Sequence, residues 1–107
     1  LLGFSQGCMM ALHVGLRRAQ ACAAILGYSG RLVDPAALAG EISARPPVLL
    51  CHGDADPVVP FESLALAAET LEAAGVAVTR LVRPGLGHGL DEPAIEAGAA
   101  LLARTLA

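Results

Sequence analysis

The sequence contains a serine whose neighbours favour a role as a nucleophile. Ser5 lies in the segment GFSQG (residues 3–7), which matches the pattern G-x-S-x-G and stands between an apolar strand end and a predicted helix. A serine on such a strand-to-helix turn is lifted above the sheet, and small neighbours avoid collisions around its strained backbone. The turn also places the backbone N–H of Gln6 at a helix N-terminus, where it can stabilise an oxyanion. An ordinary strand-to-helix turn is the alternative explanation of this pentapeptide.

A histidine and two aspartates are candidates for the base and the acid that a serine nucleophile needs. His88, in the segment GLGHG (residues 85–89), follows the last predicted strand, and its flanking glycines let the imidazole reach a neighbouring site. The acid lies in CHGDADPVVP (residues 51–60). Asp56 precedes a proline, which biases it towards an extended conformation that can point back over the sheet edge. Asp54 follows a glycine and is better suited to closing the turn, so the residues alone favour Asp56 modestly.

A metal site is an alternative use of the same polar residues. Its ligands would be His52, Asp54, Asp56 and His88. Their spacing matches no common ligand signature, and a metal site would leave the turn at Ser5 unexplained. We therefore predict neither metal nor cofactor. His52 is interpreted as a hydrogen-bonded scaffold residue at a strand end, and His13 as a packed or partly exposed residue of the first helix.

Short apolar runs and amphipathic segments alternate along the chain, which predicts the elements that position these residues. Strands are predicted over residues 1–4, 21–27, 48–51 and 76–83. Helices are predicted over residues 6–19 and 61–74, with a short helix opening at residues 34–35 and a last helix starting at residues 91–93. This alternation favours right-handed crossovers, so the fold class is α/β, with a parallel doubly wound sheet of about four strands and flanking helices. Sites in such sheets form at the carboxyl ends of the strands, where Ser5, Asp56 and His88 all fall.

The predicted helices differ in how much of their surface is apolar. Residues 61–74 carry apolar side chains at positions 61, 64, 65, 68 and 71 and are followed by Gly75, which is typical of a helix end. Residues 6–19 are apolar almost all round, as expected for a helix buried against a sheet. In the last helix, one face carries Ile95, Ala99, Leu102 and Leu106.

Composition and charge exclude several classes of function. Hydrophobic residues make up 55% of the 107 residues and charged residues 16%, so one well-buried domain is expected rather than a disordered chain. A net charge of -3 without a basic stripe argues against nucleic acid and against an anionic membrane surface, and no apolar run is long enough to span a bilayer. The three cysteines, Cys8, Cys22 and Cys51, lack a CxxC spacing and favour buried thiols in a reducing, cytoplasmic compartment.

Three segments together resemble the phospholipase/carboxylesterase family of the α/β-hydrolase superfamily, which includes the acyl-protein thioesterases. They are LGFSQG (residues 2–7), HGDADPVVP (residues 52–60) and PGLGH (residues 84–88), and they follow the order and spacing of that family through nearly the whole chain. By the family pattern, the aspartate immediately before the segment PVVP is the triad acid, which gives Asp56 that role. The resemblance makes Ser5 the nucleophile, His88 the base and the Gln6 N–H an oxyanion donor. It implies hydrolysis of carboxylic esters or thioesters without cofactor or metal. The expected partner is a small-molecule ester or thioester substrate, with a lysophospholipid and an acylated protein as alternatives.

The chain departs from this family in two ways. Cys8 stands where members commonly have a glycine and is expected to crowd the turn slightly. The family's second oxyanion donor comes from a loop after an early strand that has no counterpart here, so residues 1–107 are expected to form a single partial domain, the C-terminal portion of the enzyme. Losing one donor costs about a hundredfold or more in turnover. The first strand would also be cut short, leaving an apolar edge through which the isolated chain is expected to aggregate or form a homodimer.

Position alone suggests the residues of a substrate pocket. Tyr28 follows the second predicted strand, and it is a candidate to line the pocket together with Val58 and Leu86; a plain turn at Tyr28 is an equal alternative. Two rival functions stand beside the hydrolase. One is a truncated, non-catalytic fragment that acts as a structural or interaction module. The other is a dienelactone-hydrolase-like enzyme, which Ser5 disfavours because that family uses cysteine at the equivalent turn.

Overall fold

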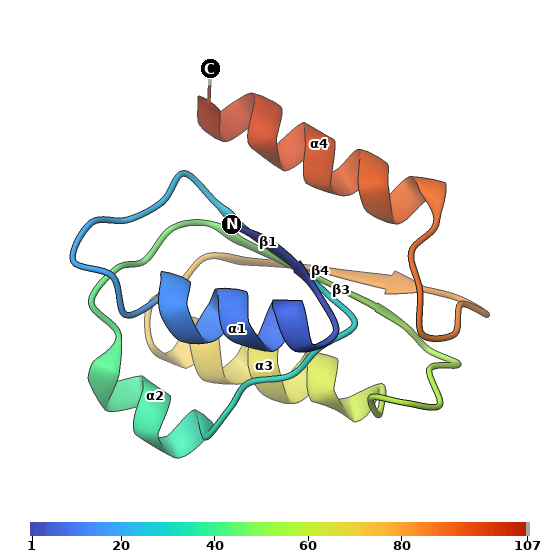
Figure 1. The fold of residues 1–107 in the computed structure, drawn as a ribbon, viewed down its shortest axis with the longest axis horizontal. Helices are drawn as coiled ribbons and strands as arrows, with labels where there is room; N and C mark the ends of the chain where they lie inside the picture. The colour runs from blue at the N-terminus through green and yellow to red at the C-terminus, as the bar shows by residue number, and fades with distance from the viewer. Residues whose placement is uncertain (107) are drawn as a thin grey trace.

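The computed structural model describes residues 1–106, which form a four-stranded parallel sheet with helices on both faces (Figure 1). The strands are β1 (Leu2–Phe4), β2 (Ile25–Tyr28), β3 (Val48–Gly53) and β4 (Val78–Arg83), and they lie side by side in chain order. The helices are α1 (Gln6–Gly15), α2 (Pro35–Glu41), α3 (Glu62–Ala73) and α4 (Glu92–Leu106). The predicted α/β fold class, with its alternating strands and helices, is confirmed.

The sheet separates two apolar layers. On one face, α1, α2 and α3 cover the larger core, to which Leu12, Leu38 and Leu71 contribute. On the other face, α4 covers a smaller core, and Figure 1 shows this helix on the opposite side of the sheet from α1 and α3. Every residue of β2 and β3 is buried, because side chains alternate between the two faces and both faces are covered. The ends of these strands are therefore rigid supports for the loops that follow them.

An apolar edge lies along β1 and α1. Because β1 is an outer strand of the described sheet, one side of its backbone has no neighbouring strand among residues 1–106. The side chains of Leu1 and Leu2 are 45% and 63% exposed, and those of Met10 and Val14 on α1 are 60% and 45% exposed. A strand edge flanked by large apolar side chains is a surface on which further protein can pair or pack.

The first helix is shorter than its apolar pattern predicts. We expected a helix over residues 6–19 that is apolar almost all round and buried against the sheet, whereas α1 ends at Gly15 and exposes Met10 and Val14. The carbonyl oxygen of Leu16 accepts hydrogen bonds from the N–H groups of Ser43 at 2.8 Å and Ala44 at 3.1 Å. The Arg17 N–H donates to the Val14 carbonyl oxygen at 3.1 Å instead of to the His13 oxygen, which accepts from the Arg17 side chain, so the helical pattern stops before Leu16 turns to the distant segment. Similarly, β2 starts at Ile25, later than the predicted residue 21.

The packed face of α4 is not the face that carries Ile95 and Leu106, which are 56% and 68% exposed. Its buried residues are Ala94, Gly98 and Leu101. The Tyr28 hydroxyl donates a hydrogen bond to the Ala94 carbonyl oxygen at 3.0 Å, and a Cβ at Gly98 would lie 2.1 Å from that hydroxyl. Only small residues fit beside the Tyr28 hydroxyl, so Ala94 and Gly98 face it, while Leu101 packs into the core further along the helix.

Candidate active site

Ser5 lies at the turn from β1 to α1 and has a strained backbone. Its φ of 58° and ψ of -117° lie outside the regions that residues with a side chain normally adopt. The turn is held on both sides, because the Ser5 N–H donates to the Tyr28 carbonyl oxygen at 2.8 Å and the Ser5 carbonyl oxygen accepts from the Met9 N–H at 3.1 Å. Strain of this kind persists only where surrounding contacts fix it, and it concentrates at functional sites.

The two glycines that flank Ser5 differ in their surroundings. A Cβ at Gly3 would lie 2.0 Å from the Gly7 carbonyl oxygen, so the first turn of α1 can approach β1 only if residue 3 is glycine. A Cβ at Gly7 would meet no atom of the described chain within 4 Å. The collision that the motif predicts is therefore present at Gly3 and absent at Gly7 among residues 1–106.

Cys8 fits beneath the turn because two glycines face it. A Cβ at Gly30 would lie 2.6 Å from the Cys8 Sγ, and one at Gly27 would lie 2.8 Å from it. Burial raises the pKa of the Cys8 thiol to about 12, although a backbone hydrogen bond at Gly30 acts in the opposite direction. The crowding expected from a cysteine at this position is thus relieved, and the thiol stays protonated at neutral pH.

The Asp56 carboxylate is enclosed by the loop after β3. Its Oδ1 accepts hydrogen bonds from the N–H groups of Val58 at 2.8 Å and Val59 at 2.9 Å, and its side chain is 0% exposed. Burial raises the pKa of Asp56, but the hydrogen bonds from His88 and from the Val59 and Val58 backbone lower it by more, so the pKa lies below its ordinary value of 3.8. The carboxylate is therefore ionised at neutral pH.

Asp54 joins two loops, whereas the sequence indicates that it closes its own turn. Its exposed carboxylate accepts a hydrogen bond from the Gly85 N–H at 2.8 Å, which ties the loop after β3 to the loop after β4. The same two loops touch at their backbones, because the Ala55 N–H donates to the Leu86 carbonyl oxygen at 3.1 Å. A Cβ at Gly53 would lie 2.1 Å from that oxygen, so the close approach requires glycine.

The loop that carries His88 is also fixed at its far end. Arg83 and Asp91, on its two sides, form an ion pair with a separation of 2.8 Å. The hydrogen bond from Arg83 lowers the pKa of Asp91, whose Oδ1 accepts from the Ala94 N–H at 3.1 Å at the start of α4. The Ser29 hydroxyl, at the end of β2, donates to the Gly89 carbonyl oxygen at 3.4 Å. The loop is thus attached to β4, to the start of α4 and to the end of β2.

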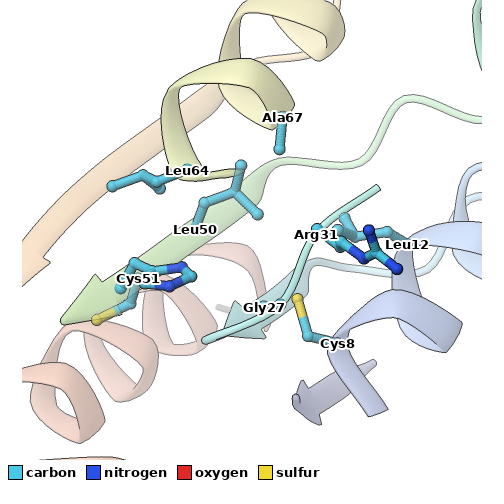
Figure 2. A pocket seen from close by; sticks show the side chains of 10 residues that line it. Cys8, Leu12, Gly27, Arg31, Leu50, Cys51, Leu64 and Ala67 are labelled. Carbon is cyan, nitrogen blue, oxygen red and sulfur yellow. The ribbon is translucent and has the colours of Figure 1, made fainter. Parts of the chain in front are cut away.

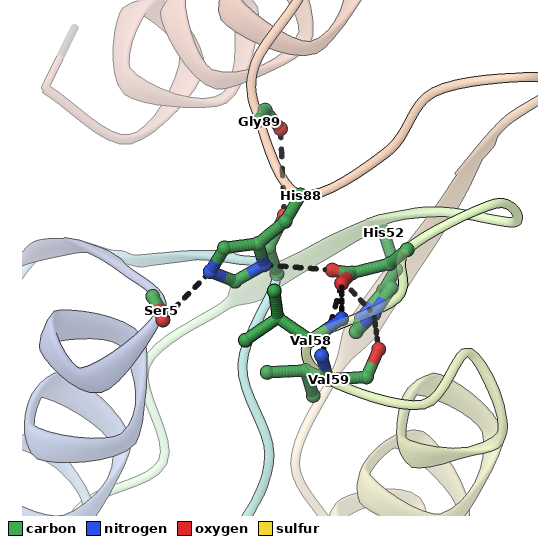
Figure 3. A network of polar contacts seen from close by, with 8 residues as sticks. Ser5, His52, Val58, Val59, His88 and Gly89 are labelled. Carbon is green, nitrogen blue, oxygen red and sulfur yellow. Dashed lines mark hydrogen bonds and ion pairs between the residues drawn. The ribbon is translucent and has the colours of Figure 1, made fainter.

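These loops bring Asp56, His88 and Ser5 into one line of hydrogen bonds (Figure 3). His88 Nδ1 lies 2.8 Å from Asp56 Oδ2, and His88 Nε2 lies 2.9 Å from Ser5 Oγ. Because an ionised carboxylate only accepts, Nδ1 must carry a proton in neutral His88, which leaves Nε2 as the acceptor for the serine hydroxyl. A hydroxyl, an imidazole and a carboxylate in this order can together activate the hydroxyl as a nucleophile.

The structure places the predicted pocket residues in two different regions. Val58 is 64% exposed on the loop that holds Asp56, and Leu86 is half-buried on the loop that holds His88. The Tyr28 side chain is not brought to this site, because its hydroxyl is bound to α4 and only 3% of the residue is exposed. Burial raises its pKa, and the nearby Cys51 adds to that rise.

Phe4 lies at the site, although the sequence did not identify it. Its ring centroid is 4.9 Å from that of His88, and the residue is 37% exposed. Phe4 occupies the unspecified position before the serine in the G-x-S-x-G pattern, so the pattern carries no signal for it. Only the path of the loop after β4 brings the two rings together.

A small cavity between the sheet, α1 and α3 does not include the hydrogen-bonded residues of the site. It is lined by Cys8, Leu12, Leu50, Leu64 and Ala67, among others (Figure 2). Its volume of about 10 Å³ leaves room for about one water molecule. The cavity is therefore too small to hold an acyl group.

The polar residues considered as a metal site are engaged in other contacts. Asp54 accepts from Gly85, and His52 Nε2 lies 3.0 Å from the Val59 carbonyl oxygen, as expected for a scaffold residue. Within residues 1–106, no group of three or more His, Cys, Asp or Glu side chains could hold a metal ion.

None of the described helices combines the length and the apolar character needed to cross a membrane.

Comparisons with known proteins point to a single family. The family model described as Phospholipase/Carboxylesterase matches residues 1–105. Acyl-protein thioesterase 1 of Gibberella zeae is 37% identical over 91 residues, which cover 80% of this chain and 39% of that protein. Esterase YpfH of Escherichia coli is 31% identical over 96 residues, which cover 90% of this chain and 40% of that protein.

The fold is also that of a solved esterase. The crystal structure of esterase PE8 has a TM-score of 0.95 and 40% sequence identity, and the match covers 98% of this chain and 49% of that one. The present chain therefore spans about two-fifths of the length of the two curated relatives and about half of the solved esterase.

Proposed function

Because this chain belongs to the phospholipase/carboxylesterase family, we propose that it carries the catalytic residues of a serine hydrolase that cleaves carboxylic esters or thioesters. One observation carries this proposal, namely the unbroken line of hydrogen bonds from Asp56 through His88 to Ser5. The positive φ of Ser5 and the ionised, enclosed carboxylate of Asp56 support it. Ser5 is the proposed nucleophile, His88 the general base and Asp56 the acid that orients His88.

In the proposed reaction, Ser5 Oγ attacks the acyl carbon while its proton passes to His88 Nε2. Asp56 remains ionised and stabilises the imidazolium that forms. The imidazolium then protonates the leaving group, which departs as an alcohol or a thiol and leaves the acyl group as an ester on Ser5. A water molecule, deprotonated by the same imidazole, cleaves this ester to release a carboxylic acid and regenerate the hydroxyl. These steps need no metal or cofactor.

The backbone N–H of Gln6 is the proposed oxyanion donor. Gln6 is the first residue of α1, and the first four N–H groups of a helix have no partner within the helix and carry its positive end. Gln6 directly follows Ser5, so its N–H lies close to the position of the substrate carbonyl oxygen, on which negative charge develops when Ser5 attacks the carbon. We propose that residues 1–107 form part of a single α/β-hydrolase domain and that a second donor comes from sequence outside them. The length of the relatives supports this division.

The apolar side chains near His88 favour a substrate with an apolar acyl group. Val58 and Leu86 lie on the two loops that hold Asp56 and His88, and we propose that both contact the acyl chain. Phe4, which packs against the His88 ring, extends the same apolar surface. We do not propose that Tyr28 contacts the acyl chain, because its hydroxyl is bound to α4. The names of the relatives include both esterase and acyl-protein thioesterase, so we propose carboxylic oxygen esters and thioesters as substrates.

Unpaired cysteines support a location in the cytoplasm. Cys8, Cys22 and Cys51 are all free thiols, and thiols persist in reducing compartments. Burial, aided by Asp91 and partly opposed by Arg83, raises the pKa of Cys51 to about 11, so this thiol stays protonated at neutral pH. The apolar edge along β1 and α1 supports the further proposal that the isolated chain associates with itself as a homodimer or larger assembly.

A fluorophosphonate probe tests the proposal, because it forms a covalent adduct with an activated serine. The protein carrying this chain, its Ser5→Ala variant and its Ser43→Ala variant would be treated with the probe, and the adduct would be mapped by mass spectrometry. Ser43 is an exposed serine that contacts Leu16 through its backbone N–H, so its substitution is a matched control. We expect an adduct on Ser5, none in Ser5→Ala and full labelling in Ser43→Ala.

Two results would contradict this function. An adduct on another serine would remove Ser5 as the nucleophile. The absence of any adduct, in a protein that circular dichroism shows to be folded, would favour a non-catalytic structural or interaction module instead. The same labelling of residues 1–107 alone would then show whether the Gln6 donor suffices for acylation.

A further inference from the structure

A second imidazole, that of His52, lies beside Asp56 and takes no part in the proposed reaction. His52 is the penultimate residue of β3 and is 2% exposed. Its Nε2 lies 3.0 Å from the Val59 carbonyl oxygen and 3.3 Å from Asp56 Oδ2. Figure 3 shows the His52 and His88 rings approaching the same turn from different directions.

The hydrogen bond to Val59 fixes the protonation of His52 Nε2. A carbonyl oxygen only accepts, so this nitrogen must carry a proton and donate it. The protonated edge of the ring also faces Asp56 Oδ2, although the hydrogen bond itself goes to Val59. The positive end of the N–H dipole thus lies next to the carboxylate, which is a favourable electrostatic arrangement.

Val59 connects His52 to the Asp56 carboxylate. The Val59 N–H donates to Asp56 Oδ1 at 2.9 Å, while its carbonyl oxygen accepts from His52. One end of this link belongs to β3, whose six residues are all buried in the sheet, and the other end is the proposed triad acid. With Oδ1 held in this way, Oδ2 is left to accept the hydrogen bond from His88 Nδ1, which lies 2.8 Å away. The Val58 N–H holds the same oxygen at 2.8 Å, so a displacement of Val59 would remove one of the two backbone donors that orient the carboxylate towards His88.

From these contacts we infer that His52 is a positioning residue, which holds Val59 against β3 and thereby fixes the orientation in which Asp56 meets His88. The inference rests on the proposed function, because this orientation affects turnover only if His88 is the base. A plain packing role is the competing explanation, since the Phe61 ring meets the His52 ring edge-on with centroids 6.1 Å apart. The two roles differ in one respect: positioning requires an N–H donor at residue 52, and packing does not.

Three substitutions of His52 and one of Phe61 separate these roles. His52→Gln keeps an N–H donor near the position of Nε2, whereas the shorter amide of His52→Asn does not reach Val59. His52→Leu removes the donor and keeps an apolar side chain. Phe61→Leu changes the packing around the ring while leaving the hydrogen bond in place. For each variant of the protein, kcat and KM with p-nitrophenyl butyrate and the Tm would be measured.

We expect His52→Asn and His52→Leu to lower kcat about ten- to hundredfold, because small errors in the alignment of catalytic groups have effects of this size. KM should change little, since His52 does not contact the substrate. His52→Gln should recover most of the lost kcat, and Phe61→Leu should lower Tm with little change in kcat. The proton resonance of His88 Nδ1–H gives a readout without substrate, and it should shift in His52→Asn and return in His52→Gln.

Several results would overturn this inference. The first is a kcat equal to that of the parent in folded His52→Asn or His52→Leu. The second is an equal loss of kcat in His52→Gln and His52→Asn. The third is that both donor-free variants fail to fold while His52→Gln folds, which would make the role of His52 structural. Fluorophosphonate labelling separates these results from failure of the proposed function. If Ser5 of the parent is labelled, an unaffected His52→Asn counts against His52 alone; if it is not, the function fails first.

Discussion

The two halves of the candidate site lie in very different surroundings. Asp56 and His88 stand on loops that follow β3 and β4, and these loops bind each other through the contacts of Asp54 with Gly85 and of Ala55 with Leu86. Ser5 stands at the end of β1, an outer strand whose flanking apolar side chains are exposed. β4 is the other outer strand of the described sheet, but the loop that follows it is bound by the loop after β3. The acid is therefore fully buried and its loop supports that of the base, while the nucleophile borders an edge lined by exposed apolar side chains. These two regions are the enclosed half and the open half of the site.

This difference shows which geometry the chain can maintain by itself. The Asp56 carboxylate accepts hydrogen bonds from the N–H groups of Val58, Val59 and His88, so residues 1–106 supply all the donors described for it. The Ser5 turn depends on the close approach of Gly3 to α1 and on hydrogen bonds of Ser5 to Tyr28 and to Met9. We therefore expect substitutions in the enclosed half to act on the chemistry, and substitutions in the open half to act on folding and association as well.

The largest expected effect is that of Asp56→Asn. Its amide can present an N–H to His88 and favour the wrong imidazole tautomer, which in a serine triad costs about ten-thousandfold in kcat. Asp54→Asn is the matched control, because the exposed Asp54 contacts only the neighbouring loop and an amide oxygen can still accept from Gly85. The kcat of each variant with p-nitrophenyl butyrate would be compared. Nearly equal kcat values for the two variants would refute the assignment of the acid to Asp56.

Gly3→Ala and Gly7→Ala test the open half of the site. A Cβ at Gly3 would lie 2.0 Å from a backbone oxygen, so Gly3→Ala should lower the free energy of unfolding by about 3 kcal/mol or more. Gly7→Ala, which meets open space at the start of α1, should change it by less than about 1 kcal/mol. Urea unfolding of both variants measures the difference. Equal losses would mean that the turn is not held by the contact between Gly3 and Gly7.

Residue types and order predicted the fold class and the positions of the candidate residues at the strand ends, because both follow from local patterns. Local patterns did not predict the residues at which helices and strands begin or end, or the face that a helix buries. α1 ends early because the Arg17 N–H binds Val14 instead of His13, and α4 turns Ala94 and Gly98 towards Tyr28 because the tyrosine hydroxyl reaches Ala94. The contact of Phe4 with His88 depends in the same way on a distant loop. The catalytic roles of the candidate residues stay a prediction.

The enclosed half should also have a characteristic response to acid. The folded pKa of Asp56 lies below its ordinary value of 3.8, so its stabilising contribution is present above that pH and is lost as the pH falls through the folded pKa. We expect the urea midpoint to fall steeply below about pH 4, and less steeply in Asp56→Asn. Asp91, whose pKa is lowered by Arg83, contributes with the same sign, so Asp91→Asn is the comparison variant. An unchanged acid response in Asp56→Asn would place the stabilising carboxylate elsewhere.

The smallest expected effect concerns the open edge and leaves the chemistry untouched. We expect residues 1–107 alone to elute as dimers or larger species, because exposed apolar edges attract further chain. Met10→Lys places a charge beside that edge and should shift the population towards monomer in chromatography with light scattering. Leu66→Lys is the matched control, since Leu66 on α3 is similarly exposed at 57% against 60% for Met10 but lies away from β1. If both variants behaved alike, association would reflect general surface hydrophobicity, and the contrast between an enclosed and an open half of the site would lose its structural basis.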